Sequence, residues 1–196
     1  MKRYLLALGT SLLLSGSAFA QIQVLDFEDR PEAVDATGLS SYHGITFDDN
    51  FFTYGWTQAP YTAHSGTVRA AINNLFEGLG EARFTFDTPD QYFLGAFFSG
   101  YDTNAVHFNL YNDGNLVGSS SSLILGAVPT WLESGYSGTV DEVGIYGDSG
   151  RLIFDDLTYS ANRPDVGAVP EPSTYGLMGA VVLVLGAAIR RRTARK

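Results

Sequence analysis

The sequence contains no cysteine, and this absence removes several kinds of chemistry at once. Thiol nucleophiles, disulfide bonds and zinc sites with cysteine ligands are all excluded. The absence does not assign a compartment, because an exported chain with an adequate hydrophobic core folds without disulfides. The compartment has to be inferred from the two ends of the chain.

Basic residues are scarce in the central part of the chain. Between Gln21 and Pro170 there are 20 acidic residues, five arginines and no lysine, so this stretch has a net charge of −15. Such a surface repels the phosphate backbone of nucleic acids and attracts cations. We therefore expect no nucleic-acid partner.

The first 20 residues have the pattern of a secretory signal. Lys2 and Arg3 are followed by an apolar run over 4–14, and Ala18 and Ala20 place small side chains at an A-x-A site. This pattern predicts cleavage by signal peptidase after Ala20 and export of the rest of the chain. The alternative is an uncleaved anchor helix, for which the apolar run is short.

The last 23 residues combine an uncharged run with a basic end. Residues 174–189 carry no charge, and Arg190, Arg191 and Arg192 follow directly. As a helix the run spans about 24 Å, slightly less than the ~30 Å hydrocarbon core of a bilayer. Because positive charge stays on the cytoplasmic side, we expect a transmembrane helix over 174–189, a basic tail over 190–196 and an outward-facing domain over 21–168. The alternative is a buried helix of the domain, but the run has no polar face.

A short proline-containing motif precedes the apolar run. It consists of Val169, Pro170, Glu171, Pro172 and Ser173. This motif, the apolar run and the terminal arginines together resemble a PEP-CTERM protein-sorting signal over 169–196. The resemblance implies processing by a membrane-embedded exosortase in a Gram-negative bacterium that makes exopolysaccharide and biofilm matrix. We then expect export, transient anchoring in the inner membrane, and release to the cell surface or matrix.

Helical periodicity is nearly absent between the two ends, apart from one expected turn over 30–37. Apolar and polar residues alternate instead, as in strands. The strand candidates are 21–28, 44–49, 67–72, 81–87, 91–100, 104–112, 115–122, 121–128, 141–147 and 151–160. Asp113 and Gly114 form the clearest two-residue hairpin turn. The pattern predicts an all-β, jelly-roll-like β-sandwich.

Three short sequence segments resemble segments of extracellular carbohydrate-binding or lectin-like sandwiches. They are LDFED (25–29), YHGITFDD (42–49) and LIFDDLTYS (152–160). The resemblance implies that the first and last strands pair and that an acidic residue from each holds a structural calcium ion. The ligands would be Glu28 with Asp155 or Asp156, since calcium prefers oxygen ligands. The alternative is a solvated acidic edge. No other cofactor is expected.

Aromatic residues are concentrated in 41–61. Exposed aromatic rings stack on the C–H faces of sugars, and Tyr54, Trp56 and Trp131 are the candidates for such a glycan platform. The alternative is that aromatic residues fill the core of the sandwich, as they often do in strands.

Two functions remain open. The first is a non-enzymatic surface or matrix protein that is associated with exopolysaccharide and binds glycans. The second is a small secreted hydrolase acting on glycans with a carboxylate pair such as Glu77 and Glu81 or Asp141 and Glu142, which would need a separation of ~5–10 Å across a cleft. The three histidines have no zinc-protease spacing, and a dispersed Ser-His-Asp site stays open.

Overall fold

The computed structural model describes residues 21–30, 37–72, 79–148 and 150–164, and within them all regular secondary structure is strand. A search of these described residues therefore finds no helix long and apolar enough to cross a membrane. The predicted signal peptide, the sorting motif and the predicted transmembrane helix lie outside the described residues, as does most of the expected turn over 30–37.

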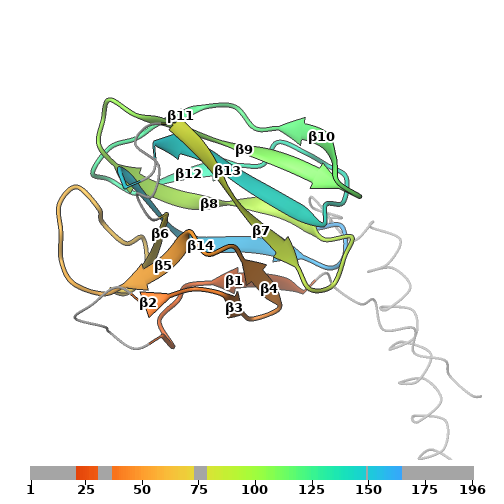
Figure 1. Ribbon diagram of the computed structural model, residues 1–196, viewed down its shortest axis with the longest axis horizontal. Helices are drawn as coiled ribbons and strands as arrows, with labels where there is room; N and C mark the ends of the chain where they lie inside the picture. The colour runs from red at the N-terminus through yellow and green to blue at the C-terminus, as the bar shows by residue number, and fades with distance from the viewer. Residues whose placement is uncertain (1–20, 31–36, 73–78, 149, 165–196) are drawn as a thin grey trace, which may run out of the picture. The chain divides into compact units, whose positions relative to one another are not determined.

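The described residues form two antiparallel sheets (Figure 1). Sheet A has the order β12-β8-β14-β6-β5-β2, with β1 paired to β14, and sheet B has the order β10-β9-β13-β7-β4-β3, with β11 paired to β9. The strands are β1 (Ile22–Leu25), β2 (Thr37–Gly38), β3 (Ser41–Tyr42), β4 (Ile45–Phe47), β5 (Phe51–Tyr54), β6 (Arg69–Ile72), β7 (Leu79–Phe86), β8 (Tyr92–Gly100), β9 (Ala105–Asn112), β10 (Asn115–Ser119), β11 (Leu123–Ile124), β12 (Thr130–Glu133), β13 (Glu142–Asp148) and β14 (Leu152–Ser160). The all-β sandwich predicted from the sequence is confirmed.

The first and last strands pair with each other, as expected. Ile22 lies opposite Ser160 and Leu25 lies opposite Leu157 in the antiparallel register of β1 and β14. This pairing brings both ends of the sandwich domain to the same sheet.

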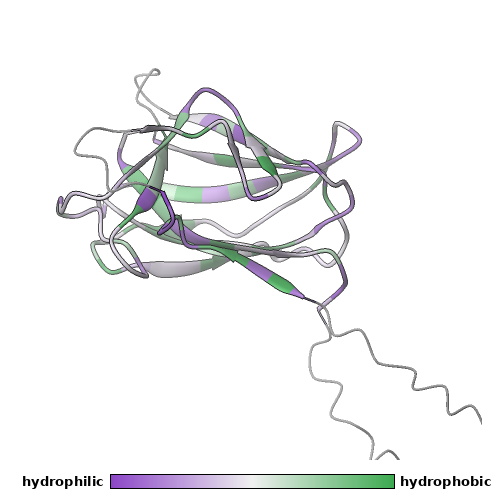
Figure 2. Cartoon of the chain, turned by 90° about the horizontal axis from the view of Figure 1, so that it is seen from below, coloured by the Kyte–Doolittle hydropathy of each residue, from purple (hydrophilic) through white to green (hydrophobic). Residues whose placement is uncertain are grey.

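The core lies between the two sheets and is made by alternate residues of each strand. Figure 2 shows hydrophilic and hydrophobic residues following one another along the strands. Phe84 on β7 and Phe108 on β9 are fully buried, and Phe108 meets Phe93 of β8 edge to face at 4.8 Å. Because side chains alternate across a strand, the residues between these positions point away from the core on the outer face of sheet B.

The predicted hairpin joins β9 to β10. Asn112 pairs with Asn115, and the two residues between them, Asp113 and Gly114, have φ angles of 49° and 73°. Two successive positive φ angles define the type I′ turn, whose twist matches that of the flanking strands. The hairpin prediction is confirmed.

Candidate functional site

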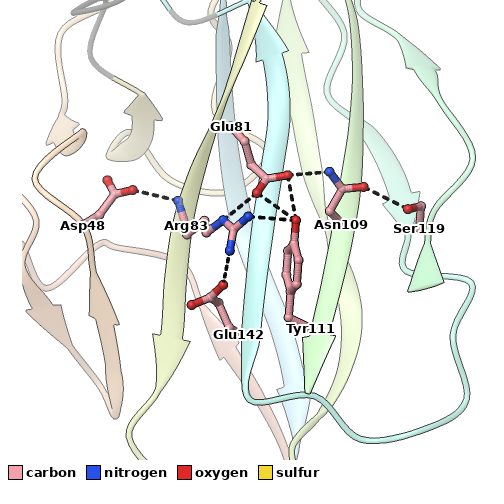
Figure 3. Close-up of polar contacts among 7 residues, drawn as sticks. All are labelled: Asp48, Glu81, Arg83, Asn109, Tyr111, Ser119 and Glu142. Atoms are coloured by element: carbon pink, nitrogen blue, oxygen red, sulfur yellow. Dashed lines mark hydrogen bonds and ion pairs between the residues drawn. The ribbon is translucent and has the colours of Figure 1, made fainter. Parts of the chain in front are cut away.

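The outer face of sheet B carries a set of polar and aromatic side chains, and Figure 3 shows those that surround Glu81. Arg83 of β7 and Asn109 of β9 both lie opposite Gly144 of β13, which runs between them. We call this set the polar face. It consists of Glu81, Arg83, His107, Asn109, Tyr111, Ser119, Glu142 and Tyr146.

Glu81 is the centre of the polar face and accepts hydrogen bonds from three side chains. The Asn109 amide donates to Oε2, the Tyr111 hydroxyl donates at 3.0 Å to Oε1, and Arg83 Nε lies 2.5 Å from the same oxygen. The Glu81 side chain is 15% exposed. Burial alone would raise its pKa, but the hydrogen bonds from Asn109, Tyr111 and Arg83 outweigh burial, so the pKa of the Glu81 carboxyl lies below its usual value. The carboxylate therefore stays charged and fixed in place.

Arg83 joins Glu81 to the rest of the polar face. Its Nη1 donates to Glu142 at 2.7 Å, and its Nη2 donates to the Tyr111 hydroxyl at 2.9 Å. The guanidinium lies 4.1 Å from the centre of the Tyr111 ring, within the range of a cation–π contact. Its backbone N–H donates to Asp48 at 2.8 Å. The positive charge is thus already balanced by carboxylates of the same surface.

The polar face continues from Glu81 along β13 and β9 and onto β10. Asn109 accepts a hydrogen bond from the Ser119 hydroxyl at 2.9 Å, which continues the network onto β10. His107 and Tyr146 lie opposite each other on β9 and β13, and their ring centres are 4.9 Å apart. The face therefore presents fixed hydrogen-bonding groups next to half-buried aromatic rings.

The three aromatic residues predicted for a glycan platform lie elsewhere. The prediction for Tyr54 is wrong: the residue is only 4% exposed, because Phe52 and Trp56 pack against its ring, with ring centres 5.7 and 4.3 Å away. Trp56 is 38% exposed in the segment that follows β5, and Trp131 is 37% exposed on the edge strand β12. The strand order of sheet A places β8, β14 and β6 between β12 and β5, so the two tryptophans do not form one platform.

The carboxylates predicted to bind calcium hold the segment 64–68. Glu28 accepts hydrogen bonds from the backbone N–H groups of Thr67 and Val68 at 2.7 and 2.6 Å. Asp155 accepts from the N–H groups of His64 and Ser65 at 2.8 and 2.9 Å. Among the described residues, no group of three or more histidine and acidic side chains is arranged to hold a metal ion. The shared calcium ion stays a prediction.

Asp156 accepts from two side chains of the same segment, which bears on the Ser-His-Asp alternative. Both His64 Nδ1, at 2.5 Å, and the Ser65 hydroxyl, at 2.8 Å, are bonded to the Asp156 carboxylate. A nucleophilic serine instead needs its hydroxyl on the histidine nitrogen that receives the proton. This arrangement fixes a loop and does not activate Ser65.

Three of the four carboxylates predicted for a hydrolase lie among the described residues, and each is bonded to other groups of the sandwich. Glu142 is bonded to Arg83, and Asp141 accepts the backbone N–H of Asp113 at 2.9 Å. Glu77 lies outside the described residues, and Glu81 is the centre of the polar face. The outward residues Arg83, Asn109 and Tyr111 were not predicted as site residues, although the alternation of apolar residues in 81–87 and 104–112 places them on one surface.

Comparison with known proteins identifies a sorting motif in the C-terminal part of the sequence. Residues 168–192 match the model of the PEP-CTERM protein-sorting motif. The chain therefore carries a PEP-CTERM sorting motif, as its sequence predicted, and this motif implies an exported protein that is processed by an exosortase. A search of the curated proteins finds none that matches the chain.

Several solved structures resemble the sandwich at low similarity. A structure described as a carbohydrate binding module of family 29 has a TM-score of 0.42 and 13% identity, covering 77% of this chain and 95% of that chain. A CBM29-2 mutant complexed with cellulohexaose has a TM-score of 0.43 and 13% identity, covering 79% of this chain and 100% of that chain. At these values the similarity supports no conclusion about what this chain binds.

Proposed function

We propose that the chain is a non-enzymatic protein of the cell surface or extracellular matrix, whose sandwich binds neutral glycans through the polar face of sheet B. The sorting motif at 168–192 supports the exported location. Association with exopolysaccharide or biofilm, transient anchoring in the inner membrane and a Gram-negative host belong to the proposal.

The observation that carries the glycan-binding proposal is the network around Glu81. Asn109, Tyr111 and Arg83 hold one another and Glu81 in fixed orientations before any ligand arrives. Sugar hydroxyls need such donors and acceptors at defined positions, and a site that is already ordered loses little entropy on binding. The aromatic rings of Tyr111 and Tyr146 supply apolar surface for the C–H faces of a sugar ring.

The charge of the polar face selects against acidic glycans. Glu81 and Glu142 surround Arg83, which is already engaged with both of them. A uronate or sulfate group placed there would face two carboxylates without a free cation to bind it. The ligand class that fits is an uncharged oligosaccharide.

The test compares the effect on glycan binding of substitutions on sheet B and on sheet A, using the full chain in mild detergent. Binding to a panel of neutral hexasaccharides is measured by calorimetry for wild type, Asn109→Ala, Tyr146→Ala and Thr130→Ala. We expect the two substitutions on the polar face to weaken binding about tenfold or more, and Thr130→Ala on sheet A to leave it unchanged. Equal affinity of all four proteins would contradict the placement of the site, and no binding by wild type would contradict the glycan-binding function.

A further inference from the structure

The segment 55–68, between β5 and β6, lies on the outer face of sheet A and encloses a cleft. Tyr61 packs there with Ala71 and Ile153, apart from the main core. Thr62 N–H donates to the Ser99 hydroxyl at 2.8 Å, and the ring of His64 stacks on Phe97 of β8. The cleft has a volume of about 220 Å³ and is lined by side chains and backbone of 55–69.

Arg69 lines this cleft and is buried. It begins β6, opposite Tyr54 of β5, and is only 3% exposed. Among the described residues it is the one buried arginine. Its Nη1 donates to the carbonyl of Thr67 at 3.0 Å, its Nη2 donates to the carbonyl of Trp56 at 2.7 Å, and its guanidinium lies 4.2 Å from the centre of the Tyr54 ring.

The positive charge of Arg69 has no carboxylate partner in the described part of the chain, although the domain is strongly acidic. Arg83 and Arg151 form ion pairs and Arg69 does not. The Nε of Arg69 is buried without a hydrogen-bond partner. A buried charge normally requires an ionic partner, and a buried donor without an acceptor costs free energy. Both deficits occur in one side chain that lines a cleft.

The carboxylates that hold this segment are already engaged by other groups. Glu28 accepts from Thr67 and Val68, and Asp155 accepts from His64 and Ser65. They are therefore not the missing counterion of Arg69.

We propose that the cleft binds the carboxylate of a small organic acid, with Arg69 as the residue that recognises it. A guanidinium presents parallel N–H groups that match the two oxygens of a carboxylate. The net charge of −15 over 21–170 opposes entry of multiply charged anions more strongly than entry of a monoanion.

The polar side chains that line the cleft favour an organic acid that also carries hydroxyl groups. Thr57, Gln58 and Thr62 line it together with Tyr61, and the half-exposed Trp56 stands next to them in the chain. Hydroxyl and amide groups with an aromatic ring suit a sugar acid, and a volume of about 220 Å³ admits one ring. This site is on the other sheet from the polar face, and the inference does not rest on glycan binding there.

A purely structural role for Arg69 is the competing explanation. Its bonds to the carbonyls of Thr67 and Trp56 join the two ends of 55–68, so the side chain also holds the segment closed. A structural role predicts no response of the wild-type protein to carboxylates.

The test titrates the full chain in mild detergent with sodium glucuronate, glucose and inorganic phosphate. The chain has two tryptophans, so Trp131→Phe leaves Trp56, beside the cleft, as the only tryptophan whose emission is followed. We expect glucuronate to change the Trp56 emission and to raise the melting temperature by about 4 °C near saturation. Glucose should do neither, and phosphate should act more weakly than glucuronate.

Variants separate ligand recognition from folding. Arg69→Gln should lose the response to glucuronate, and its circular dichroism spectrum shows whether it still folds. Gln58→Ala removes none of the hydrogen bonds of Arg69 but does remove the acceptor of Trp56 Nε1, so its affinity for glucuronate is read from the melting temperature. It should fall about threefold to tenfold, whereas Thr130→Ala on the edge strand β12 should leave the affinity for glucuronate unchanged. The proposal is overturned if wild type responds to none of the probes, if phosphate binds more tightly than glucuronate, if glucose binds as well as glucuronate, or if a folded Arg69→Gln protein responds like wild type.

Discussion

The Glu81 side chain lies over Gly144 on sheet B: a Cβ atom added to Gly144 would lie 2.6 Å from Cδ of Glu81. The carboxyl of Glu81 therefore occupies the space that a side chain at 144 would take. From there it reaches Asn109 and Tyr111 on β9. Because position 144 of β13 has no side chain, Glu81 of β7 can reach across β13 and bond residues of β9.

Replacing Gly144 with alanine should displace Glu81 and disrupt the polar face. Because the atoms that clash belong to a flexible side chain, the fold should remain, with a loss of about 1–2 kcal/mol in the free energy of unfolding. Affinity for a neutral hexasaccharide should fall about tenfold or more. Urea denaturation and calorimetry measure the two quantities.

The matched control for this change is Gly80→Ala on β7. A Cβ at Gly80 has no atom within 4 Å, so neither stability nor binding should change by much. If Gly144→Ala binds glycan as wild type does, the network around Glu81 is not the binding site.

The sequence predicted the sandwich well because its signals are local. The alternation over 81–87 and 104–112 agrees with the burial of Phe84 and Phe108, and Asp113–Gly114 marks the hairpin between β9 and β10. The short strands β2, β3, β5 and β12 were not predicted. β5, for example, buries Phe51, Thr53 and Tyr54, so neighbouring residues do not alternate between buried and exposed.

The candidate sites were harder to predict because they depend on pairing between distant strands. Glu81 and Asn109 are 28 residues apart and meet only because β7 and β9 both flank β13. Tyr54 was predicted to be exposed because composition does not reveal that Phe52 and Trp56 would cover it. No local motif marks Arg69, and the absence of a carboxylate partner among the described residues is visible only in three dimensions.

Asp155 makes the stability of the sandwich depend on pH. Burial raises the pKa of its carboxyl to about 7, and the nearby charge of Asp156 adds to this effect. The folded state then holds the proton more tightly than the unfolded state, whose aspartates titrate near pH 4. Through this group the free energy of unfolding falls as pH rises from about 4 to about 7 and is level above that.

Asp155→Asn should remove this contribution. The variant is less stable overall, because an asparagine cannot accept all three backbone hydrogen bonds, but its stability should fall less between pH 5 and pH 7 than that of wild type. Urea denaturation across this range checks the slope, with Asp102→Asn at an exposed position as the control. Parallel pH profiles of wild type and Asp155→Asn would show that the Asp155 carboxyl is not the titrating group.

Calcium sharing by Glu28 and Asp155 or Asp156 is tested by melting curves. An ion that binds only the folded state stabilises it, so a shared site predicts a higher melting temperature in millimolar calcium than in chelator. Magnesium at the same concentration controls for screening of the acidic surface. Identical melting curves in calcium and in chelator would contradict the shared calcium site. These carboxylates would then serve only as hydrogen-bond acceptors for the segment 64–68.

The N-terminus of the exported protein should be Gln21. Ala18 and Ala20 present the small side chains that signal peptidase requires, so cleavage after Ala20 is expected. Intact mass of the exported protein checks this, and Ala20→Phe should block the cleavage. An exported wild-type chain that retains Met1 would contradict the cleaved signal.

A substitution in the sorting motif distinguishes membrane anchoring from processing by the exosortase. Pro170 and Pro172 restrict φ and lack N–H donors, so the sequence predicts an extended, accessible motif outside the predicted membrane helix. Glu171→Ala keeps both prolines, the apolar run over 174–189 and the terminal arginines. Anchoring should therefore survive this change, while processing should fail because the motif loses its one charged side chain.

Fractionation of epitope-tagged chains in a host with an exosortase measures both steps. Wild type should reach the surface or the medium without its C-terminal tail, and Glu171→Ala should accumulate at full length in the membrane. The comparison variant removes the charges of Arg190–Arg192 and leaves the motif intact. It should disturb membrane retention or orientation, because these charges oppose translocation of the tail. If wild type keeps Lys196 and stays in the inner membrane, the tail acts as an anchor alone, and exosortase processing of this chain is contradicted.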